Sequence, residues 1–169
     1  RDSYWGDQHL ALTMGPDRAM RMDACGTAKR LGVPFTIHSD APVTPLSPLF
    51  TAWCAVNRQT ASGRVLGANE CIDVNDALRA VTLGAAFTLH LDHLVGSIEP
   101  GKYADFAVLD EDPTGVPVEM LKDVPVWGTV MGGAVYPGTH HKFCSSDVHA
   151  AKAVVAFHGA RGVSGGWED

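Results

Sequence analysis

Between residues 24 and 58 the sequence alternates between helical and strand patterns, and this constrains the fold more than any other feature. Residues 24–31 (ACGTAKRL) have a helical composition, and Gly32 follows at the position where a glycine commonly ends a helix. Residues 33–38 (VPFTIH) form a short apolar run typical of a strand, and residues 49–58 (LFTAWCAVNR) predict a second helix. This order predicts an α/β fold built from βα repeats.

Residues 73–91 predict a longer helix. Asp73 is a good N-cap residue, and Asp76 stands three positions later, where the second residue of a capping box is found. Apolar residues then recur at intervals of three and four, the spacing that places them on one helix face. One side of this helix is therefore expected to be buried.

After residue 94 the apolar period changes to two, which is typical of strands. Residues 99–102 (EPGK) place Pro and Gly in the order that a type II turn prefers. Gly132-Gly133 predicts a two-residue hairpin turn of the primed type. This part is expected to form a small β unit. Its strands are predicted over residues 95–98, 104–109, 126–131 and 134–136.

Composition and charge exclude several classes of protein. The 169 residues are 46% hydrophobic and 19% charged, which is a globular composition. The formal net charge is -6 without a basic stripe, and no apolar run approaches the length of a membrane span. Neither a nucleic acid nor a membrane is therefore predicted as a partner. Cys25, Cys54, Cys71 and Cys144 are scattered, which predicts reduced thiols and a cytoplasmic location.

Asp40 is the strongest candidate for a catalytic residue. It follows the predicted strand 33–38 directly, after Ser39, and a proline-rich loop comes next. The carboxyl ends of strands are where (β/α) barrels keep their catalytic groups. On position alone, a carboxylate that caps a turn or a helix is the alternative.

Two stretches give the sequence a recognisable identity. Residues 38–43 (HSDAPV) resemble the last barrel strand of the amidohydrolase superfamily, and residues 96–106 (GSIEPGKYADF) resemble its C-terminal region. The helical segment between them and the hairpin at Gly132-Gly133 also match in order and spacing. The resemblance covers about residues 1–137. It is closest to the amidohydrolase family 3 branch, which includes N-substituted formamide deformylases.

The resemblance implies a fold and a domain arrangement. The family has a (β/α)₈ barrel with a small β-sandwich, and this chain would be the C-terminal part of such a metal-dependent hydrolase. Residues 1–93 would form the end of the barrel with its following helix. Residues 94–137 would form part of the β-sandwich, and residues 138–169 remain an unassigned C-terminal tail.

The resemblance also implies a metal site and a reaction. One or two divalent ions, usually zinc, are held by an H-x-H pair, a bridging carboxylate-type group, two further histidines and the aspartate of the last strand. Only that aspartate maps here, as Asp40, and the sequence has no H-x-H. The expected reaction is hydrolysis of a carbon–nitrogen bond in a small-molecule amide, formamide or cyclic amide. Asp40 would be both metal ligand and proton carrier.

Four further residues are candidates for binding the substrate. His38 and Ser39 adjoin Asp40, and packing beneath the site is the alternative for His38. Trp5 and Asp7 would lie at the mouth of the site, together with Tyr4. A core position for Trp5 and a helix-capping role for Asp7 are the alternatives.

Other polar residues are expected to have structural roles. His90 and His93 are placed at a helix end, where a cationic side chain is favourable. Lys102 is expected as the exposed polar residue of a turn, and Asp105 is expected to satisfy backbone groups at the edge of the sandwich. The spacing of the remaining candidates matches no zinc motif, so a solvated tail is expected there. They are His140, His141, Cys144, Asp147 and His149.

Two hypotheses of other classes stay open. The chain could be a non-catalytic piece that folds only with a partner supplying the missing N-terminal part of the barrel, because a lone βα unit leaves strand edges unpaired. It could also be a simple β/α binding module. A homo-oligomer is a further open possibility, and the sequence fixes neither the substrate nor the number of metal ions.

Overall fold

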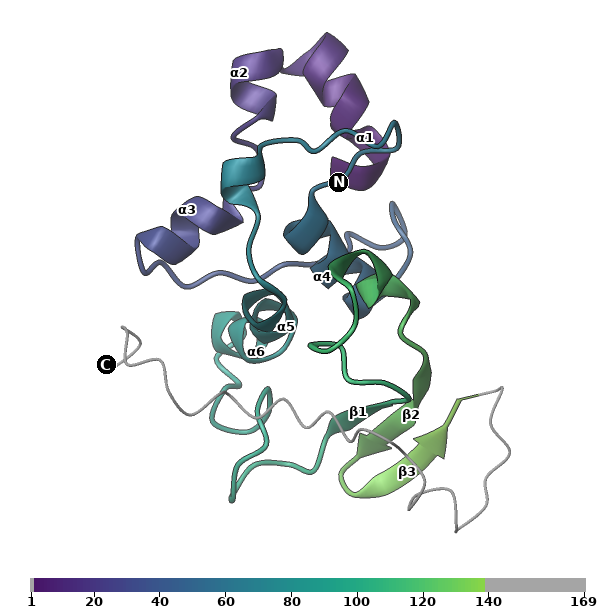
Figure 1. Cartoon of the computed structure of the whole chain (residues 1–169). Coiled ribbons are helices and arrows are strands. Elements are labelled where there is room, and N and C mark those ends of the chain that lie inside the picture. The colour runs from purple at the N-terminus through teal and green to yellow at the C-terminus, as the bar shows by residue number, and fades with distance from the viewer. Residues whose placement is uncertain (1, 139–169) are drawn as a thin grey trace.

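The computed structural model describes residues 2–138, an arrangement of short helices followed by a three-stranded sheet (Figure 1). The predicted α/β class is confirmed at this level. The elements are α1 (Asp2–Gln8), a π-helix (His9–Thr13), α2 (Pro16–Ala19), α3 (Cys25–Arg30), α4 (Pro48–Asn57), a 3₁₀ helix (Ala68–Glu70), α5 (Val74–Val81), α6 (Leu83–Thr88), β1 (Phe106–Leu109), a second 3₁₀ helix (Val118–Asp123), β2 (Val126–Met131) and β3 (Ala134–Pro137).

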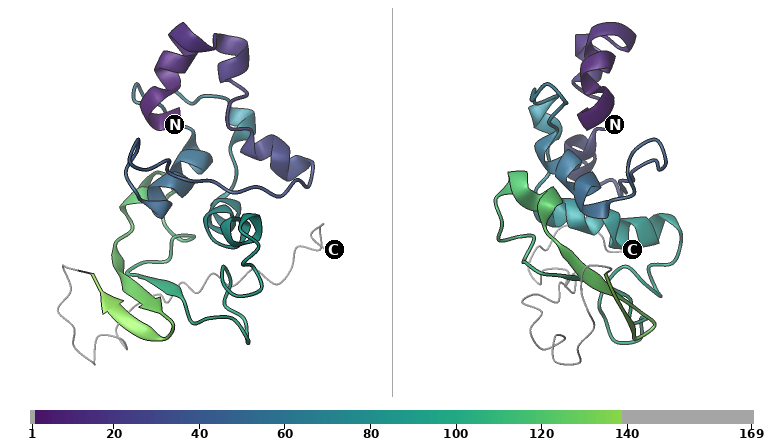
Figure 2. Two further views of the ribbon diagram at one scale, coloured as in Figure 1. Left: turned by 180° about the vertical axis from the view of Figure 1, so that it is seen from behind. Right: turned by 90° about the vertical axis from the view of Figure 1, so that its right-hand side faces the viewer.

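The elements are arranged roughly in chain order from one end of the described region to the other (Figure 2). The helices α1 and α2 lie at one end, α3, α4 and α5 lie in the middle, and the sheet lies at the opposite end. Between β1 and β2 the chain leaves the sheet, and the second 3₁₀ helix packs against α4. The middle layer therefore connects the N-terminal helices to the β unit.

The helix predicted over residues 24–31 is confirmed as α3, and its end has a local cause. Gly32 has φ 66° and follows the helix as predicted. The N–H of Gly32 donates to the carbonyl of Lys29 at 3.1 Å, and the N–H of Val33 donates to that of Ala28 at 2.9 Å. These two bonds form a Schellman motif, in which a glycine in the left-handed region is favoured.

The strand predicted over residues 33–38 is not formed in the described part of the chain. No ladder is assigned to any residue from 33 to 40. The segment is instead tied to α5 by Thr36 Oγ1, which donates to the carbonyl of Ala80 at 2.9 Å. A strand exists only when a neighbour completes its hydrogen bonds, and residues 2–138 provide no such neighbour here.

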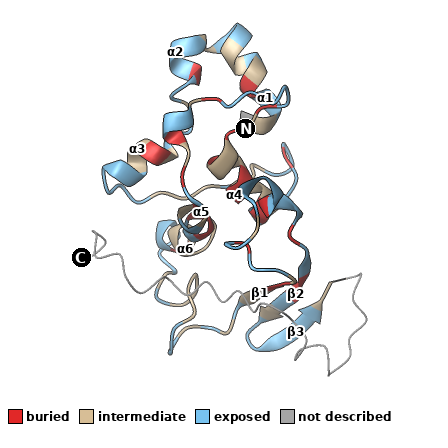
Figure 3. Ribbon diagram, viewed as in Figure 1, coloured by how far each residue is buried: buried red, intermediate tan, exposed pale blue. Residues whose placement is uncertain are grey.

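The buried core lies in the middle layer (Figure 3). α4 begins at Pro48, where Ser47 caps the helix by accepting a hydrogen bond from Phe50 N at 3.3 Å, and the proline at the first position suits a helix start. Trp53 Nε1 donates to the carbonyl of Glu119 at 2.9 Å and links α4 to the second 3₁₀ helix. The core cluster contains Leu49, Ala52, Trp53, Ala55, Ile72, Ala77, Leu78, Leu109, Leu121 and Val124.

The long helix predicted over residues 73–91 is divided into α5 and α6. Its start is confirmed, because Asp73 accepts a hydrogen bond from Asp76 N at 2.9 Å. The break falls at Thr82, which has φ -117° and ψ -91°. Gly84 then lies so close to the carbonyl of Phe35 that an added Cβ would stand 2.6 Å from that oxygen. This close approach to residues 33–38 is a tertiary contact, and the spacing of apolar residues in the sequence gives no sign of it.

The sheet has the strand order β1-β2-β3, with both pairs antiparallel. The predicted hairpin is confirmed, since Met131 pairs with Ala134 and both Gly132 (φ 56°) and Gly133 (φ 83°) have the positive φ that a type I′ turn requires. The turn at residues 99–102 is also confirmed. Gly101 has φ 98°, and Lys102 N donates to the carbonyl of Glu99 at 3.2 Å.

The strand predicted over residues 95–98 is wrong, because this segment bends instead of pairing. Gly96 has φ 95°, and a Cβ added to it would stand 2.7 Å from Cβ of Ala86 on α6. The chain therefore turns over α6, and this contact requires glycine.

The described residues contain neither a closed barrel nor a second sheet, so the barrel and sandwich assignments stay predictions. The residues from 139 to the end of the predicted tail, including His140, His141, Cys144, Asp147 and His149, lie outside the described part. No helix within residues 2–138 combines the length and apolarity needed to cross a bilayer.

Candidate active site

A cavity of about 460 Å³ opens where residues 35–40 run between α3 and α4. Apolar and polar residues both line its wall, and His38, Ser39 and Asp40 are among the polar ones. Its volume is in the range of small-molecule sites. It is lined by Tyr4, Asp23, Ala24, Cys25, Ala28, Phe35, Thr36, Ile37, His38, Ser39, Asp40, Thr44, Phe50, Thr51, Cys54, Ala55 and Arg58.

Asp40 lines this cavity at the end of the extended segment. Its backbone has φ 59°, a left-handed conformation that is uncommon for residues other than glycine but is enriched in Asp and Asn. The carbonyl of Asp40 accepts a hydrogen bond from Val43 N at 2.8 Å, which closes a turn containing the cis Ala41–Pro42 peptide bond. A left-handed conformation at a residue other than glycine, such as that of Asp40, is often found at functional sites.

His38 and Ser39 also line the cavity, and both interact with the turn that carries Asp40. Nδ1 of the exposed His38 accepts a hydrogen bond from the backbone N–H of Asp40 at 3.1 Å. Nδ1 therefore carries no hydrogen, and a neutral imidazole has its proton on Nε2. The carbonyl of Ser39 accepts a hydrogen bond from the hydroxyl of Thr44.

Trp5 and Asp7 are not brought to this cavity. Trp5 lies on α1 with 44% of its surface exposed. The Asp7 carboxylate accepts hydrogen bonds from the Thr60 hydroxyl at 3.0 Å, and from the hydroxyl and backbone N–H of Ser62 at 2.8 and 3.0 Å. The side-chain hydrogen bond from Ser62 is the main cause that lowers the pKa of Asp7 below its ordinary value. Asp7 thus ties α1 to the turn after α4.

Arg58, at the C-terminal end of α4, is a cavity residue that sequence reasoning missed. It is 1% exposed and adopts φ 47°. Nε donates to the carbonyl of Leu66 at 2.6 Å, and the two Nη atoms donate to those of Asp23 (3.0 Å) and Met22 (2.7 Å). An arginine at the end of a predicted helix looks like an ordinary exposed residue, so the sequence carried no signal of this role.

The described residues do not fit a metal ion by themselves. Within residues 2–138, no three His, Cys, Asp or Glu side chains are grouped so that they could hold one. A catalytic zinc ion takes three protein ligands and leaves a position for water. Asp40 would supply one carboxylate, and Nδ1 of the neighbouring His38 is already engaged with the backbone. Any ion at this cavity would depend on ligands from outside the described residues.

The residues expected to be structural are placed accordingly. Asp105 Oδ1 accepts a hydrogen bond from Gly132 N at 2.7 Å, which confirms that it satisfies a backbone group at the hairpin. Lys102 Nζ donates to Ser97 Oγ at 2.6 Å. It therefore stabilises its own loop, although it is less exposed than predicted. His90 and His93 follow the end of α6 as expected, and His90 N–H donates to the carbonyl of Phe87 at 2.9 Å.

Comparison with known proteins identifies the family. The family model described as "Amidohydrolase family" matches residues 2–137. This chain belongs to the amidohydrolase family. The family consists of hydrolases that act on carbon–nitrogen bonds and generally use divalent metal ions. The resemblance predicted from HSDAPV and GSIEPGKYADF is thereby confirmed.

Three curated relatives are similar over most of the chain. N-substituted formamide deformylase of Arthrobacter pascens is 33% identical over 130 residues, which are 77% of this chain and 22% of the relative. YtcJ of Bacillus subtilis is 30% identical over 125 residues, which are 72% of this chain and 24% of YtcJ. Protein LONG AFTER FAR-RED 3 of Arabidopsis thaliana is 32% identical over 155 residues, 79% of this chain and 26% of the relative.

The chain spans about a quarter of the length of these curated relatives. No solved structure matches it.

Proposed function

We propose that this chain is the C-terminal part of a hydrolase that cleaves a non-peptide carbon–nitrogen bond in a small-molecule amide, formamide or cyclic amide. The observation that supports this most is the position of Asp40, which lines a cavity at the end of an extended segment in a chain of the amidohydrolase family. The relative named N-substituted formamide deformylase supports the formamide class.

In the proposed reaction Asp40 is the group that moves the proton. Its carboxylate takes a proton from water as the water oxygen bonds to the carbonyl carbon of the substrate. It then gives the same proton to the nitrogen as the carbon–nitrogen bond breaks, so that a carboxylic acid and an amine leave. An amide side chain at this position would keep the shape but could not accept the proton.

We further propose that Asp40 is one ligand of a divalent metal site holding one or two ions, with zinc as the preferred metal. The remaining ligands would come from outside the described residues, because those residues contain no complete site. In this arrangement residues 1–93 form the end of the (β/α)₈ barrel and residues 94–137 form part of the β-sandwich.

The proposed substrate contacts divide into two groups. His38 and Ser39 line the same cavity as Asp40, which supports a substrate contact from at least one of them. Trp5 and Asp7 lie away from that cavity, so a substrate contact from them would need a larger substrate or a different mouth in the complete protein. We also propose a cytoplasmic location, because the four cysteines are scattered along the sequence in a pattern that predicts reduced thiols.

A substrate panel tests the proposed function. The complete protein is incubated with N-substituted formamides, secondary amides, cyclic amides and dipeptides, and the released amine is quantified. Amine release is expected from at least one of the first three classes and not from dipeptides. Exposure to a chelator should abolish the activity, and added zinc should restore it. Hydrolysis of dipeptides alone, or no hydrolysis of any class by metal-loaded protein, would contradict the proposal.

A second candidate is a non-catalytic, partner-dependent piece of such a barrel. It is favoured by one observation, the absence of a strand partner for residues 33–40 within the described chain. This alternative predicts that the complete protein, which would form only when this chain associates with the remainder of the barrel or with another copy, contains no stoichiometric metal. Metal analysis and the molar mass in solution distinguish the two candidates.

A further inference from the structure

We propose that His38 and Thr44 are positioning residues that hold Asp40 by clamping the peptide unit between Ser39 and Asp40. This inference rests on the proposed function, because it concerns how the carboxylate that moves the proton is oriented. It assigns to His38 a role other than substrate contact, and to Thr44 a role that the sequence did not indicate.

The two hydrogen bonds act on opposite sides of one planar unit. The carbonyl of Ser39 and the N–H of Asp40 belong to the same peptide group, whose atoms move together. The Thr44 hydroxyl donates to that carbonyl, and His38 Nδ1 accepts from that N–H at 3.1 Å. The orientation of this peptide plane is therefore fixed from both sides.

The next peptide plane is fixed as well. The carbonyl of Asp40 accepts a hydrogen bond from Val43 N at 2.8 Å. The φ and ψ angles of a residue describe how its two flanking peptide planes are rotated about the Cα atom. Both peptide planes beside Asp40 are therefore hydrogen-bonded, one by His38 and Thr44 and the other by Val43. Together these bonds determine the direction of the Cα–Cβ bond of Asp40.

The conformation that results is less favourable for Asp40 than one with negative φ, although Asp adopts it more readily than most residues with a Cβ. Its φ of 59° lies in the left-handed region, which is disfavoured for residues with a Cβ. Release of either end of the clamp would let the backbone relax towards negative φ. That relaxation would turn the carboxylate away from its position on the cavity wall.

The surroundings of the two clamp residues support this role. Thr44 is 6% exposed, and a buried hydroxyl requires a hydrogen-bond partner, which the Ser39 carbonyl provides. His38 is exposed, yet its Nδ1 bonds the backbone two residues later. An asparagine side chain makes the same kind of bond, from its own position to the N–H two residues on.

The test uses paired variants of the complete protein. Thr44→Val removes the hydroxyl with little change of shape, whereas Thr44→Ser keeps it. His38→Ala removes the acceptor, whereas His38→Asn keeps one that can reach Asp40 N. Thr82→Val is the matched control, because the Thr82 hydroxyl donates to the carbonyl of Leu78 at 2.8 Å on α5, outside the candidate site. For every variant kcat, KM and the unfolding midpoint are measured.

Loss of the clamp should lower kcat and leave KM nearly unchanged. A displaced catalytic group costs about tenfold to a hundredfold in rate. Thr44→Val and His38→Ala should therefore lose about tenfold or more in kcat, with KM within about threefold. Thr44→Ser and His38→Asn should restore most of the rate. Thr82→Val should keep the wild-type kcat even where its unfolding midpoint falls.

Two results would overturn the inference, and both differ from failure of the proposed function. One is a wild-type kcat in His38→Ala while Asp40→Asn is inactive. Because His38 is exposed, His38→Ala is not expected to destabilise the fold. The other is an increase in KM alone in His38→Ala, since this would identify a substrate contact. Full activity of Asp40→Asn would instead show that the proposed role of Asp40 is wrong.

Discussion

The carboxylate of Glu70 accepts hydrogen bonds from both the backbone N–H and the hydroxyl of Thr27, at 2.7 and 2.6 Å. Thr27 is in the first turn of α3, whose N-cap residue Ala24 offers no side-chain cap. Glu70 is 6% exposed and ends the first 3₁₀ helix. The start of α3 is therefore capped by a residue 43 positions later in the chain, which holds the cavity wall formed by α3 in place.

Replacing Glu70 should destabilise the chain. Glu70→Gln keeps the size of the side chain, but it removes the charge and one of the two acceptor oxygens. The expected loss is about 1–3 kcal/mol in the free energy of unfolding, the range for hydrogen bonds to a buried charged group. Urea denaturation followed by circular dichroism measures it. Glu111→Gln, at an exposed position, is the control and should leave the midpoint unchanged.

The stabilisation by Glu70 should depend on pH in a defined direction. The hydrogen bond from the Thr27 side chain is the main cause that lowers the pKa of Glu70 below its ordinary value of 4.5. A lowered pKa means that the contribution is complete above 4.5 and is lost as the pH falls through the folded-state pKa. The difference in stability between wild type and Glu70→Gln should be constant from pH 7 to about 5.5 and shrink below that. A difference that grows in acid would contradict this assignment.

Gly67 should be far less tolerant of substitution than Gly32. Both have positive φ, 69° and 66°. A Cβ on Gly67 would stand 2.1 Å from the carbonyl oxygen of Met20, whereas a Cβ on Gly32 would meet nothing within 4 Å. Gly32→Ala should cost about 1–2 kcal/mol for the backbone conformation alone. Gly67→Ala should cost about 1–3 kcal/mol more. Equal unfolding midpoints for the two variants would show that the Met20 contact is not formed.

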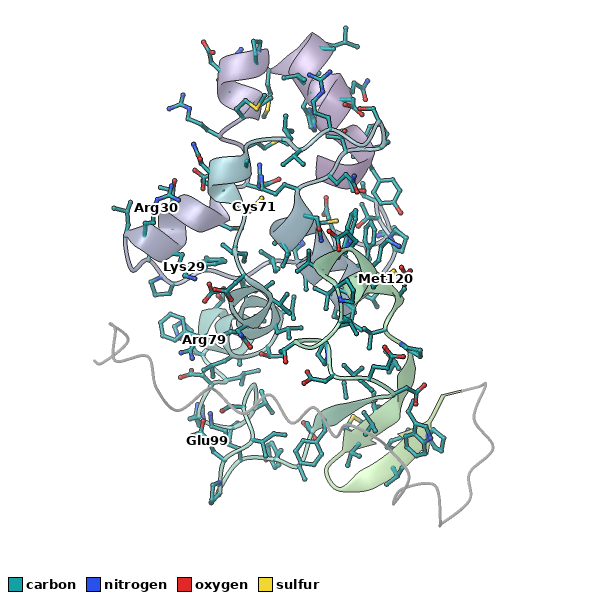
Figure 4. All side chains as sticks on the ribbon, viewed as in Figure 1. Lys29, Arg30, Cys71, Arg79, Glu99 and Met120 are labelled. Atoms are coloured by element: carbon teal, nitrogen blue, oxygen red, sulfur yellow. The ribbon has the colours of Figure 1, made fainter. Side chains whose placement is uncertain are left out.

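Lys29 should stabilise the packing of α3 against α5. Its ammonium donates to Asp73 Oδ2 at 2.7 Å and also forms an ion pair with Asp76. Figure 4 labels Lys29 on α3. Lys29→Met leaves two carboxylates beside each other without a cation. Because Lys29 is half exposed, the expected loss is only about 1 kcal/mol at pH 7.

Salt and a conservative variant separate this effect from packing. The loss of unfolding free energy caused by Lys29→Met should be smaller in 1 M salt than in 0.1 M salt. The Debye length, over which salt screens charges, falls from about 10 Å at 0.1 M to about 3 Å at 1 M. Lys29→Arg should retain most of the stability. A loss that is independent of salt would assign the role of Lys29 to its aliphatic stem.

The elements predicted well from the sequence are those with local causes. Gly32 ends α3 and Gly132-Gly133 closes the hairpin because a positive φ at a glycine is encoded by the residue itself. The cap of α5 is also local, because the Asp73 side chain accepts a hydrogen bond from the N–H of Asp76, three residues later. The strand at residues 33–38 failed because a strand depends on a neighbour that the described chain does not provide.

The residues of the candidate site also divide into those with a local signal in the sequence and those without one. Asp40 could be predicted because its place after an apolar run and before a proline-rich loop is visible in the sequence. The buried roles of Arg58 and Thr44 could not, because they consist of hydrogen bonds to carbonyls of other segments. The Glu70 cap of α3 is also a tertiary contact, to which no local pattern corresponds.

The role of Asp40 as the proton carrier is tested most directly by the steady-state rate of Asp40→Asn in the complete, metal-loaded protein. Asp17→Asn, at an exposed position, is the control. Asp40→Asn is expected to lose at least about 100-fold in kcat, the lower range for removal of a general acid–base group. Its unfolding midpoint and the activity of Asp17→Asn should match the wild type. A folded Asp40→Asn protein with wild-type kcat would show that Asp40 does not carry the proton.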